Sequence, residues 1–201
     1  MNHEAIAAWW AAVFPWLVVV LVLQRALKRT TLAKAGWMSL LVPGVIALAV
    51  LLIPVQGAIV ARWIATLISS VSIPFVGLAA VAVWGRAFEK PQLSAREWRT
   101  AWIFGAVAGL FLYPMALGIG SMDPYEWGWS FGLLFVVIAV VTAWLIWMQN
   151  RFGLLLLLAA VAFQLRLLES TNYWDYLVDP IYCAASVIAL GKRLTTRRAV
   201  L

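Results

Sequence analysis

The sequence contains little of the chemistry on which common catalytic and metal sites depend. It has one histidine, His3, and one cysteine, Cys183, among 201 residues. A single cysteine excludes an internal disulfide and a cysteine-cluster metal site, and a single histidine excludes a histidine-ligated haem or zinc site. The same count excludes a serine nucleophile with a histidine base, and no glycine-rich phosphate loop occurs. We therefore expect no cofactor and no bound metal, and our leading hypothesis is a protein without catalytic activity.

Charged residues are scarce as well, and apolar residues take their place. Asp, Glu, Lys and Arg make up 11% of the chain, whereas 65% is hydrophobic and the mean hydropathy is +0.96. This composition predicts an all-α, polytopic membrane helical bundle, since a membrane span needs about 20 apolar residues. The length accommodates seven transmembrane helices with short loops in a single domain over residues 1–201. We expect these helices at 5–23, 37–53, 63–84, from about 95, at 129–148, at 153–166 and at 173–191.

The distribution of basic residues predicts the orientation of that bundle. Of the 15 lysines and arginines, 13 follow the first, third, fifth and seventh expected spans. The positive-inside rule then places the N-terminus outside and the C-terminus inside. The expected location is the cell inner (cytoplasmic) membrane, as a multi-pass protein in contact with the lipid bilayer. The net charge of +7 is attributed to topology, so no nucleic-acid partner is expected.

Polar and aromatic side chains gather at the expected outer ends of the later spans. The stretch 164–182 is the richest in them, and ionisable groups at membrane depth are costly unless they are paired or hydrated. We therefore predict a binding cluster on the outer face. Its members in that stretch are Arg166, Glu169, Asn172, Tyr173, Trp174, Asp175, Tyr176 and Asp179, and those from earlier spans are Tyr113, Asp123, Tyr125, Glu126 and Trp127.

Two interpretations of this cluster remain open. The rings could form an interfacial aromatic belt, or they could line a water-accessible cleft together with the carboxylates. Asp175 and Asp179 are four residues apart, so they share a face if both are helical, and Arg166 is the candidate cation between them. Arg166 could instead pair with Glu169 or extend toward headgroups.

Several local patterns predict helix ends and close packing. Asp123 and Asp179 each precede a proline, which is typical of an N-cap followed by the first helical residue. Ser94 and Glu97 have capping-box spacing, so a helix should begin near residue 95. Two glycine pairs four residues apart, Gly105 with Gly109 and Gly128 with Gly132, predict close helix contacts.

These observations favour a non-catalytic membrane subunit of a cell-envelope complex. Its outer aromatic and acidic site would bind a membrane-protein partner, or an envelope glycan or lipid headgroup. One alternative is a small secondary transporter or proton-coupled carrier that uses Arg166 and the aspartates. A second alternative is a membrane-embedded enzyme that modifies lipids or glycans, in which Asp175 or Asp179 would be essential.

Overall fold

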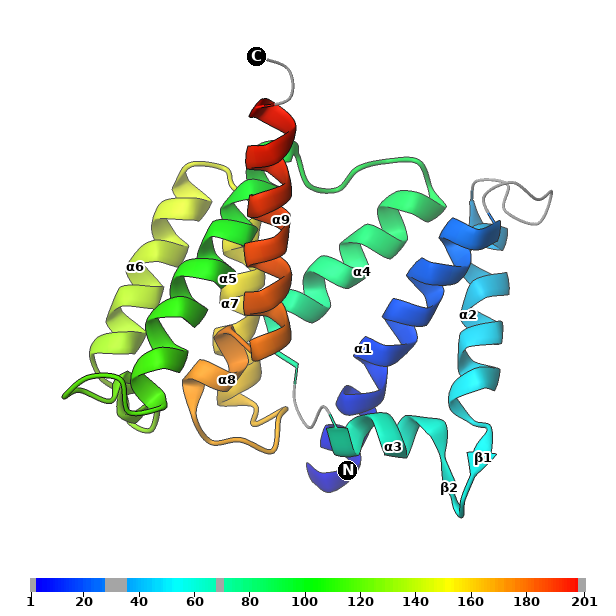
Figure 1. Cartoon of the computed structure of the whole chain (residues 1–201), viewed down its shortest axis with the longest axis horizontal. Coiled ribbons are helices and arrows are strands. Elements are labelled where there is room, and N and C mark those ends of the chain that lie inside the picture. Colours follow the sequence, from blue (N-terminus) through cyan, green and yellow to red (C-terminus); the bar gives the residue numbers. More distant parts are fainter. Residues whose placement is uncertain (1–2, 28–35, 68–70, 199–201) are drawn as a thin grey trace. The chain divides into compact units, whose positions relative to one another are not determined.

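The computed structural model describes residues 3–27, 36–67 and 71–198, and the regular structure in these ranges is almost entirely helical (Figure 1). A short β-hairpin is the exception among the described residues. In chain order the elements are α1 (His3–Ala26), α2 (Trp37–Leu51), β1 (Pro54–Val55), β2 (Ala58–Ile59), α3 (Val60–Leu67), α4 (Ile73–Ala87), α5 (Ala95–Ala116), the 3₁₀ helix η3 (Pro124–Gly128), α6 (Leu133–Trp147), α7 (Phe152–Gln164), α8 (Tyr173–Leu177) and α9 (Pro180–Arg198).

The prediction of seven transmembrane helices is wrong. Among the described residues, no helix combines the length and the apolar character that crossing a bilayer requires. Helices α2, α4 and α6 have 15 residues each and α7 has 13, which is about 20 Å at a rise of 1.5 Å per residue, against a hydrocarbon thickness of about 30 Å. Among the longer helices, α5 carries charged residues in its first turn and α9 carries them in its last two turns. The multi-pass inner-membrane location rested on those spans and is overturned with them.

Most expected helices are found, but two are interrupted. The helix expected at 63–84 is divided into α3 and α4, and α4 starts with Pro74 in its first turn, where proline is tolerated. The helix expected at 173–191 is divided at Val178, whose backbone is extended, with φ −149° and ψ 141°. The hairpin β1–β2 was not predicted; Gln56 and Gly57 both have positive φ, as a two-residue type I′ turn requires.

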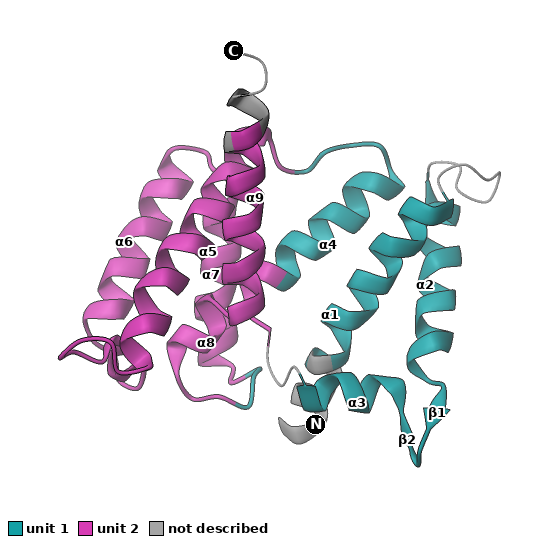
Figure 2. Cartoon of the chain, viewed as in Figure 1, with its two compact units in different colours: residues 1–70, 76–92, 167–169 teal, residues 71–75, 93–166, 170–201 magenta. Residues whose placement is uncertain are grey.

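The chain separates into two compact units, shown in Figure 2. Unit 1 comprises residues 1–70, 76–92 and 167–169, and unit 2 comprises residues 71–75, 93–166 and 170–201. In unit 1 the buried Gln24 amide of α1 donates to the carbonyl oxygens of Ser39 at 3.1 Å and Val83 at 3.2 Å. One side chain thereby links α1, α2 and α4. The single domain expected over the whole chain stays a prediction.

In unit 2, α5 packs closely against α9 because small residues line the contact. A Cβ on Gly105 would lie 2.8 Å from the ring of Tyr182, and a Cβ on Gly109 would lie 2.4 Å from the sulfur of Cys183. The close packing predicted for this glycine pair is confirmed. The buried Tyr182 hydroxyl donates to the Ala101 carbonyl at 2.6 Å, so the helices are also joined by a hydrogen bond.

Candidate functional site

The predicted cluster lies largely in unit 2, where η3 and α8 are joined by side-chain hydrogen bonds. Asp123 caps η3, since its Oδ1 accepts from the N–H of Tyr125 at 2.9 Å, as its position before Pro124 predicted. The indole N–H of Trp174 donates to the carbonyl of Pro124 at 2.8 Å. The start of α8 is therefore tied to the start of η3 across 50 residues of sequence.

Asn172 is the central polar residue of this junction, and it is completely buried. Its Oδ1 accepts from the N–H of Trp174, which caps α8, and its Nδ2 donates to the carbonyl of Tyr125, both at 2.9 Å. Gly128 makes room for it, because a Cβ there would come within 1.8 Å of Asn172 Oδ1. Glycine is thus required at 128 by the partner amide, whereas Gly132 has open space around it, with its nearest neighbour 3.9 Å away.

Asp175 is the acceptor of a second set of bonds in the same junction. Its Oδ2 accepts from the hydroxyl of Tyr125 at 2.8 Å and from the hydroxyl of Ser170. Burial, followed by the bond to Asp175, raises the pKa of Tyr125 to about 12. The phenol therefore stays protonated and donates to the carboxylate over the whole physiological pH range.

Asp179 has a different role from Asp175, and the two do not share a helical face. Asp175 belongs to α8, whereas Asp179 follows the extended Val178 and caps α9, its Oδ1 accepting from the N–H of Tyr182 at 2.9 Å. The capping role predicted from the Asp179–Pro180 pair is confirmed. Its Oδ2 accepts from the N–H and the hydroxyl of Ser72, at 2.9 and 2.6 Å, and Asp179 is only 5% exposed.

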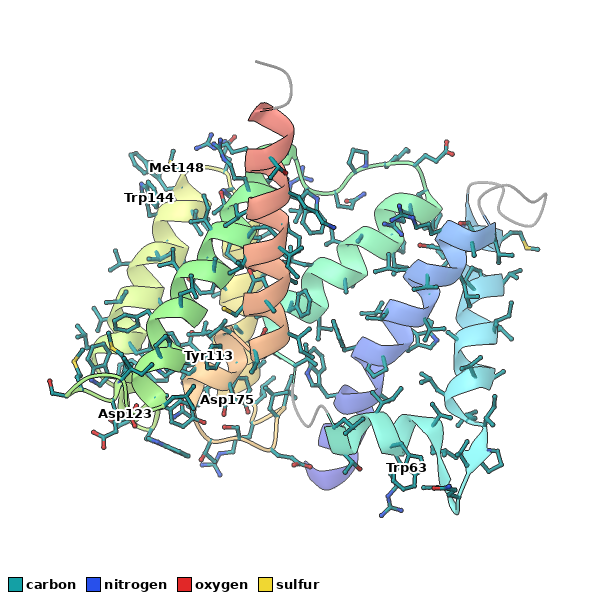
Figure 3. The ribbon with its side chains drawn as sticks, viewed as in Figure 1. Trp63, Tyr113, Asp123, Trp144, Met148 and Asp175 are labelled. Atoms are coloured by element: carbon teal, nitrogen blue, oxygen red, sulfur yellow. The ribbon has the colours of Figure 1, made fainter. Side chains whose placement is uncertain are left out.

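Two tyrosines of the cluster, Tyr173 and Tyr176, are core residues of unit 2. Tyr173 is stacked on Phe135 with centroids 4.2 Å apart, and Tyr176 packs edge-on against Phe163 at 5.2 Å. Both tyrosines are at most 1% exposed. Burial, followed by the charge of Asp179, also raises the pKa of Tyr113, which Figure 3 shows near Asp175. The rings of Tyr173 and Tyr176 are therefore closed to a ligand, whereas Tyr113 and Tyr125 are half-buried.

Arg166 does not join the aspartates. It is exposed, takes a left-handed backbone conformation with φ +50°, and makes no ion pair with Asp175 or Asp179 within the described ranges. Glu169 is exposed and belongs to unit 1. The cation proposed from sequence for the two aspartates is replaced by neutral donors, which are the hydroxyls of Tyr125, Ser170 and Ser72.

Two members of the cluster, Asp123 and Glu126, are exposed beside a tryptophan that the prediction did not include. Asp123, Glu126 and Trp129 are exposed, Trp129 at 56%, and the Trp129 ring meets Tyr125 edge-on at 5.7 Å. Figure 3 shows Asp123 in the connection between α5 and α6. Trp127 is half-buried against Phe111. We name the exposed group of Asp123, Glu126 and Trp129 the acidic-aromatic face; Trp129 was absent from the predicted site.

The carboxylates leave limited scope for acid–base or metal chemistry. Three donors surround Asp179, and two hydroxyls occupy one oxygen of Asp175. Over the part of the chain that the structure describes, no group of three or more His, Cys, Asp and Glu side chains could hold a metal ion. The arrangement is suited to fixing two loops against each other and to displaying the acidic-aromatic face.

Sequence reasoning missed Ser72, Ser170 and Tyr182 as partners of the aspartates. Ser170 lies two residues before the N-cap Asn172, a spacing at which a serine hydroxyl accepts from the backbone, and its Oγ does accept from the Asn172 N–H at 3.0 Å. That signal was local and could have been found. The bond from Ser72 to Asp179 spans 107 residues and has no counterpart in the sequence pattern.

No family model, curated protein or solved structure was found to be similar to this chain.

Proposed function

We propose that this protein is a non-catalytic subunit of a protein complex, and that its acidic-aromatic face binds a segment of a partner protein with basic and apolar side chains. The proposal rests on one observation: η3, fixed by hydrogen bonds to the α8 region, displays exposed acidic and aromatic side chains that complement basic and apolar groups. Asp123 and Glu126 supply negative charge, and Trp129 supplies an exposed ring. Aromatic residues are enriched at the centres of protein interfaces, where they contribute much of the binding energy.

The base is rigid because η3 is held from two directions. Asn172 and Trp174 of the α8 region bond the backbone of Tyr125 and Pro124, and Asp175 bonds the Tyr125 side chain. A preorganised surface loses less conformational entropy on binding than a flexible loop of the same composition. The bonds within the cluster therefore support binding even though their members are not themselves exposed.

The charge of the face favours a basic partner. The chain has 15 lysines and arginines but only 8 aspartates and glutamates, so two exposed carboxylates three residues apart reverse the sign that prevails over the molecule. Complementary charge steers association and fixes register more than it adds affinity. A partner segment with lysine or arginine beside an apolar anchor matches both parts of the face.

Glycan binding is less well supported, since the buried Asn172 amide and the carboxylates of Asp175 and Asp179 already form hydrogen bonds within the protein. The carrier and the lipid- or glycan-modifying enzyme both required membrane-spanning helices, and neither is proposed.

The proposal can be tested with labelled synthetic peptides and the full chain, by fluorescence anisotropy. A short peptide of Lys, Leu and Trp should bind, and its counterpart with Glu in place of Lys should not. Asp123→Asn with Glu126→Gln should weaken binding by about fivefold to tenfold, since exposed ion pairs contribute about 0.2–1 kcal/mol each. Asn retains the capping oxygen at 123. Trp129→Ala should weaken binding by about 30-fold, as expected for an interface anchor of about 2 kcal/mol.

The matched control is Glu89→Gln with Glu169→Gln. These two exposed carboxylates lie outside the acidic-aromatic face, and their removal changes the net charge by the same amount. If this control weakens the basic peptide as much as the variant in the face does, binding is only a response to net charge and the proposal fails. Equal binding of the acidic and the basic peptide would contradict it as well.

A further inference from the structure

An apolar stripe runs along the outer surface of α6, separate from the acidic-aromatic face. The buried side of this helix consists of Leu134, Phe135, Ile138, Thr142 and Leu145. The opposite side is exposed, and none of its residues between Leu133 and Trp147 is charged. We name this side the α6 stripe; its members and their exposed fractions are Leu133 (61%), Val136 (55%), Val137 (46%), Val140 (63%), Trp144 (54%) and Trp147 (81%).

The spacing of the stripe is that of a helix that packs on another helix. Leu133, Val137, Val140, Trp144 and Trp147 follow one another at intervals of four, three, four and three residues. An apolar repeat with a mean of 3.5 residues keeps one seam facing a partner helix, with side chains inserting into the gaps between those of the partner. A helix that is apolar on both sides is typically buried on both sides.

The order of side-chain sizes along the stripe points to one partner in particular. The small side chains lie toward its start, and the two tryptophans, Trp144 and Trp147, lie toward its end; Figure 3 shows Trp144 on α6. Val140 is the midpoint, because Trp144 and Val136 are each four residues from it and Trp147 and Leu133 are each seven. From these features we propose that the α6 stripe pairs with the α6 stripe of a second copy of this chain, antiparallel, about a two-fold axis at Val140.

Antiparallel pairing about that axis sets large side chains against small ones. Trp144 of one copy then lies opposite Val136 of the other, and Trp147 lies opposite Leu133. Close packing requires that side chains fill the available volume without voids, and alternating sizes achieve this across a helix pair. Parallel pairing would instead put tryptophan against tryptophan at one end and leave valine against valine at the other. A two-fold interface must be complementary to itself, and an uncharged stripe with this size order satisfies that condition.

The exposed area is sufficient for a dimer. An aromatic side chain can bury about 250 Å², so the exposed parts of Trp144 and Trp147 together offer about 300 Å². The four aliphatic members add about 200 Å², from about 100 Å² per side chain at roughly half exposure. If all of it were buried, the stripe would remove about 1,000 Å² from water over both copies, which is the minimum for a biological interface and the size of a weak dimer contact.

Cysteine cross-linking of the full chain tests the pairing and its direction. The native Cys183 is buried and is first replaced by Ala, so that single cysteines can be placed on the stripe. Val140→Cys should cross-link to itself, because the axis passes through this position. Leu133→Cys and Trp147→Cys, mixed as proteins of different tag length, should give a heterologous product with a short bis-maleimide. Trp147→Cys should not link to itself, since two copies of residue 147 lie about 21 Å apart along the antiparallel pair.

A charge at the axis should separate the copies. Val140→Glu places two carboxylates against each other in an apolar contact, and we expect the dimer dissociation constant to rise at least about 100-fold. The matched control is Val161→Glu on α7, which introduces the same charge at a valine that is 47% exposed and should leave the dimer intact. Sedimentation equilibrium measures both, and peptide binding by the acidic-aromatic face should be unchanged in both variants.

Four outcomes would overturn the proposal. A wild-type chain that stays monomeric over the whole concentration range would do so, as would a dimer that Val140→Glu and Val161→Glu weaken equally. Self-linking of Trp147→Cys without the heterologous product would show a parallel pair. A stripe that cross-links only to a helix of another protein would also refute pairing with a second copy.

Discussion

Replacement of Asp179 by alanine is the most informative single change in this molecule. The structure assigns the aspartate to architecture, because it caps α9 and accepts two bonds from Ser72. The sequence had left open whether it acts in a functional pair with Arg166. An architectural role predicts a large loss of stability on substitution, and a functional pair with Arg166 predicts a smaller one. The change in the free energy of unfolding therefore decides between the two roles.

The expected magnitude follows from the donors that the substitution abandons. The N–H of Tyr182, the N–H of Ser72 and the hydroxyl of Ser72 all lose their acceptor, and Ser72 is completely buried. A buried donor left without a partner costs about 1–3 kcal/mol, and loss of an N-cap costs about 1 kcal/mol. The Ser72 hydroxyl can rotate toward another acceptor, so we expect a total loss of about 3–5 kcal/mol in the free energy of unfolding.

Urea unfolding followed by far-ultraviolet circular dichroism measures this loss. Asp123→Ala is the matched control, because it removes an exposed cap and should cost only about 1 kcal/mol. A double-mutant cycle of Asp179→Ala with Ser72→Ala should show a coupling of at least about 1 kcal/mol. If Asp179→Ala costs no more than Asp123→Ala, or if the cycle shows no coupling, the architectural assignment is refuted.

Three further predictions concern other parts of unit 2. Gly128→Ala should reduce the free energy of unfolding by about 2–4 kcal/mol, because the new Cβ displaces the buried Asn172 amide. Gly191→Ala, in open space on α9, should be neutral or stabilise the protein by up to about 1 kcal/mol. Chemical unfolding of both variants measures the difference. Burial raises the pKa of Glu97, but bonds from the backbone N–H groups of Ser94 and Arg151 outweigh it, so its pKa falls below the ordinary value. Its stabilisation is therefore full above about pH 4.5 and lost as the pH falls through the lowered pKa, so Glu97→Gln should cost about 1–2 kcal/mol at pH 7 and flatten the acid limb of stability against pH. Tyr125, with a pKa raised from 10 to about 12, contributes fully below pH 10 and loses its contribution as the pH rises toward 12; Tyr125→Phe should make the alkaline fall in unfolding temperature shallower, and an unchanged profile would contradict this.

The sequence predicted local features well, because they depend on neighbours in the chain. The capping box of Ser94 with Glu97 is present, and Asp123 and Asp179 cap the elements that follow them. In each case the acceptor and the donated N–H lie within three residues of each other. Such patterns are decided before tertiary structure forms, so one sequence is enough to find them.

Long-range partners could not be predicted from the sequence, because they do not depend on neighbours in the chain. Ser72 bonds Asp179 across 107 residues and Trp174 bonds Pro124 across 50, and neither residue type specifies its partner. The predicted ion pair of Arg166 followed from the assumption that charges at membrane depth need counter-charges. Neutral hydroxyls and backbone N–H groups satisfy the carboxylates instead, which composition alone does not reveal.

The transmembrane prediction failed in two spans because the structure divides the apolar stretch, and in others, such as α2, α6 and α7, because the helix is too short. Val178 and residues 71–72 lie outside helices, although the apolar runs suggested that the helices there were continuous. A run of apolar residues indicates that the segment favours an apolar environment, but it does not indicate the length of the helix.

The gathering of all the tyrosines in unit 2 has a structural cause. An aromatic belt would keep the hydroxyls at a polar surface, yet Tyr176 and Tyr182 are fully buried, and their hydroxyls donate to the carbonyls of Ser170 and Ala101. Tyr125 donates to Asp175 in the same way. A buried ring with one polar end can fill apolar space and still satisfy an acceptor on a distant segment, which neither Phe nor Trp does with the same geometry. Tyr125, Tyr176 and Tyr182 therefore lie where α8, η3 and the ends of α5 and α9 converge, because carbonyl and carboxylate acceptors there must be bonded within an apolar environment.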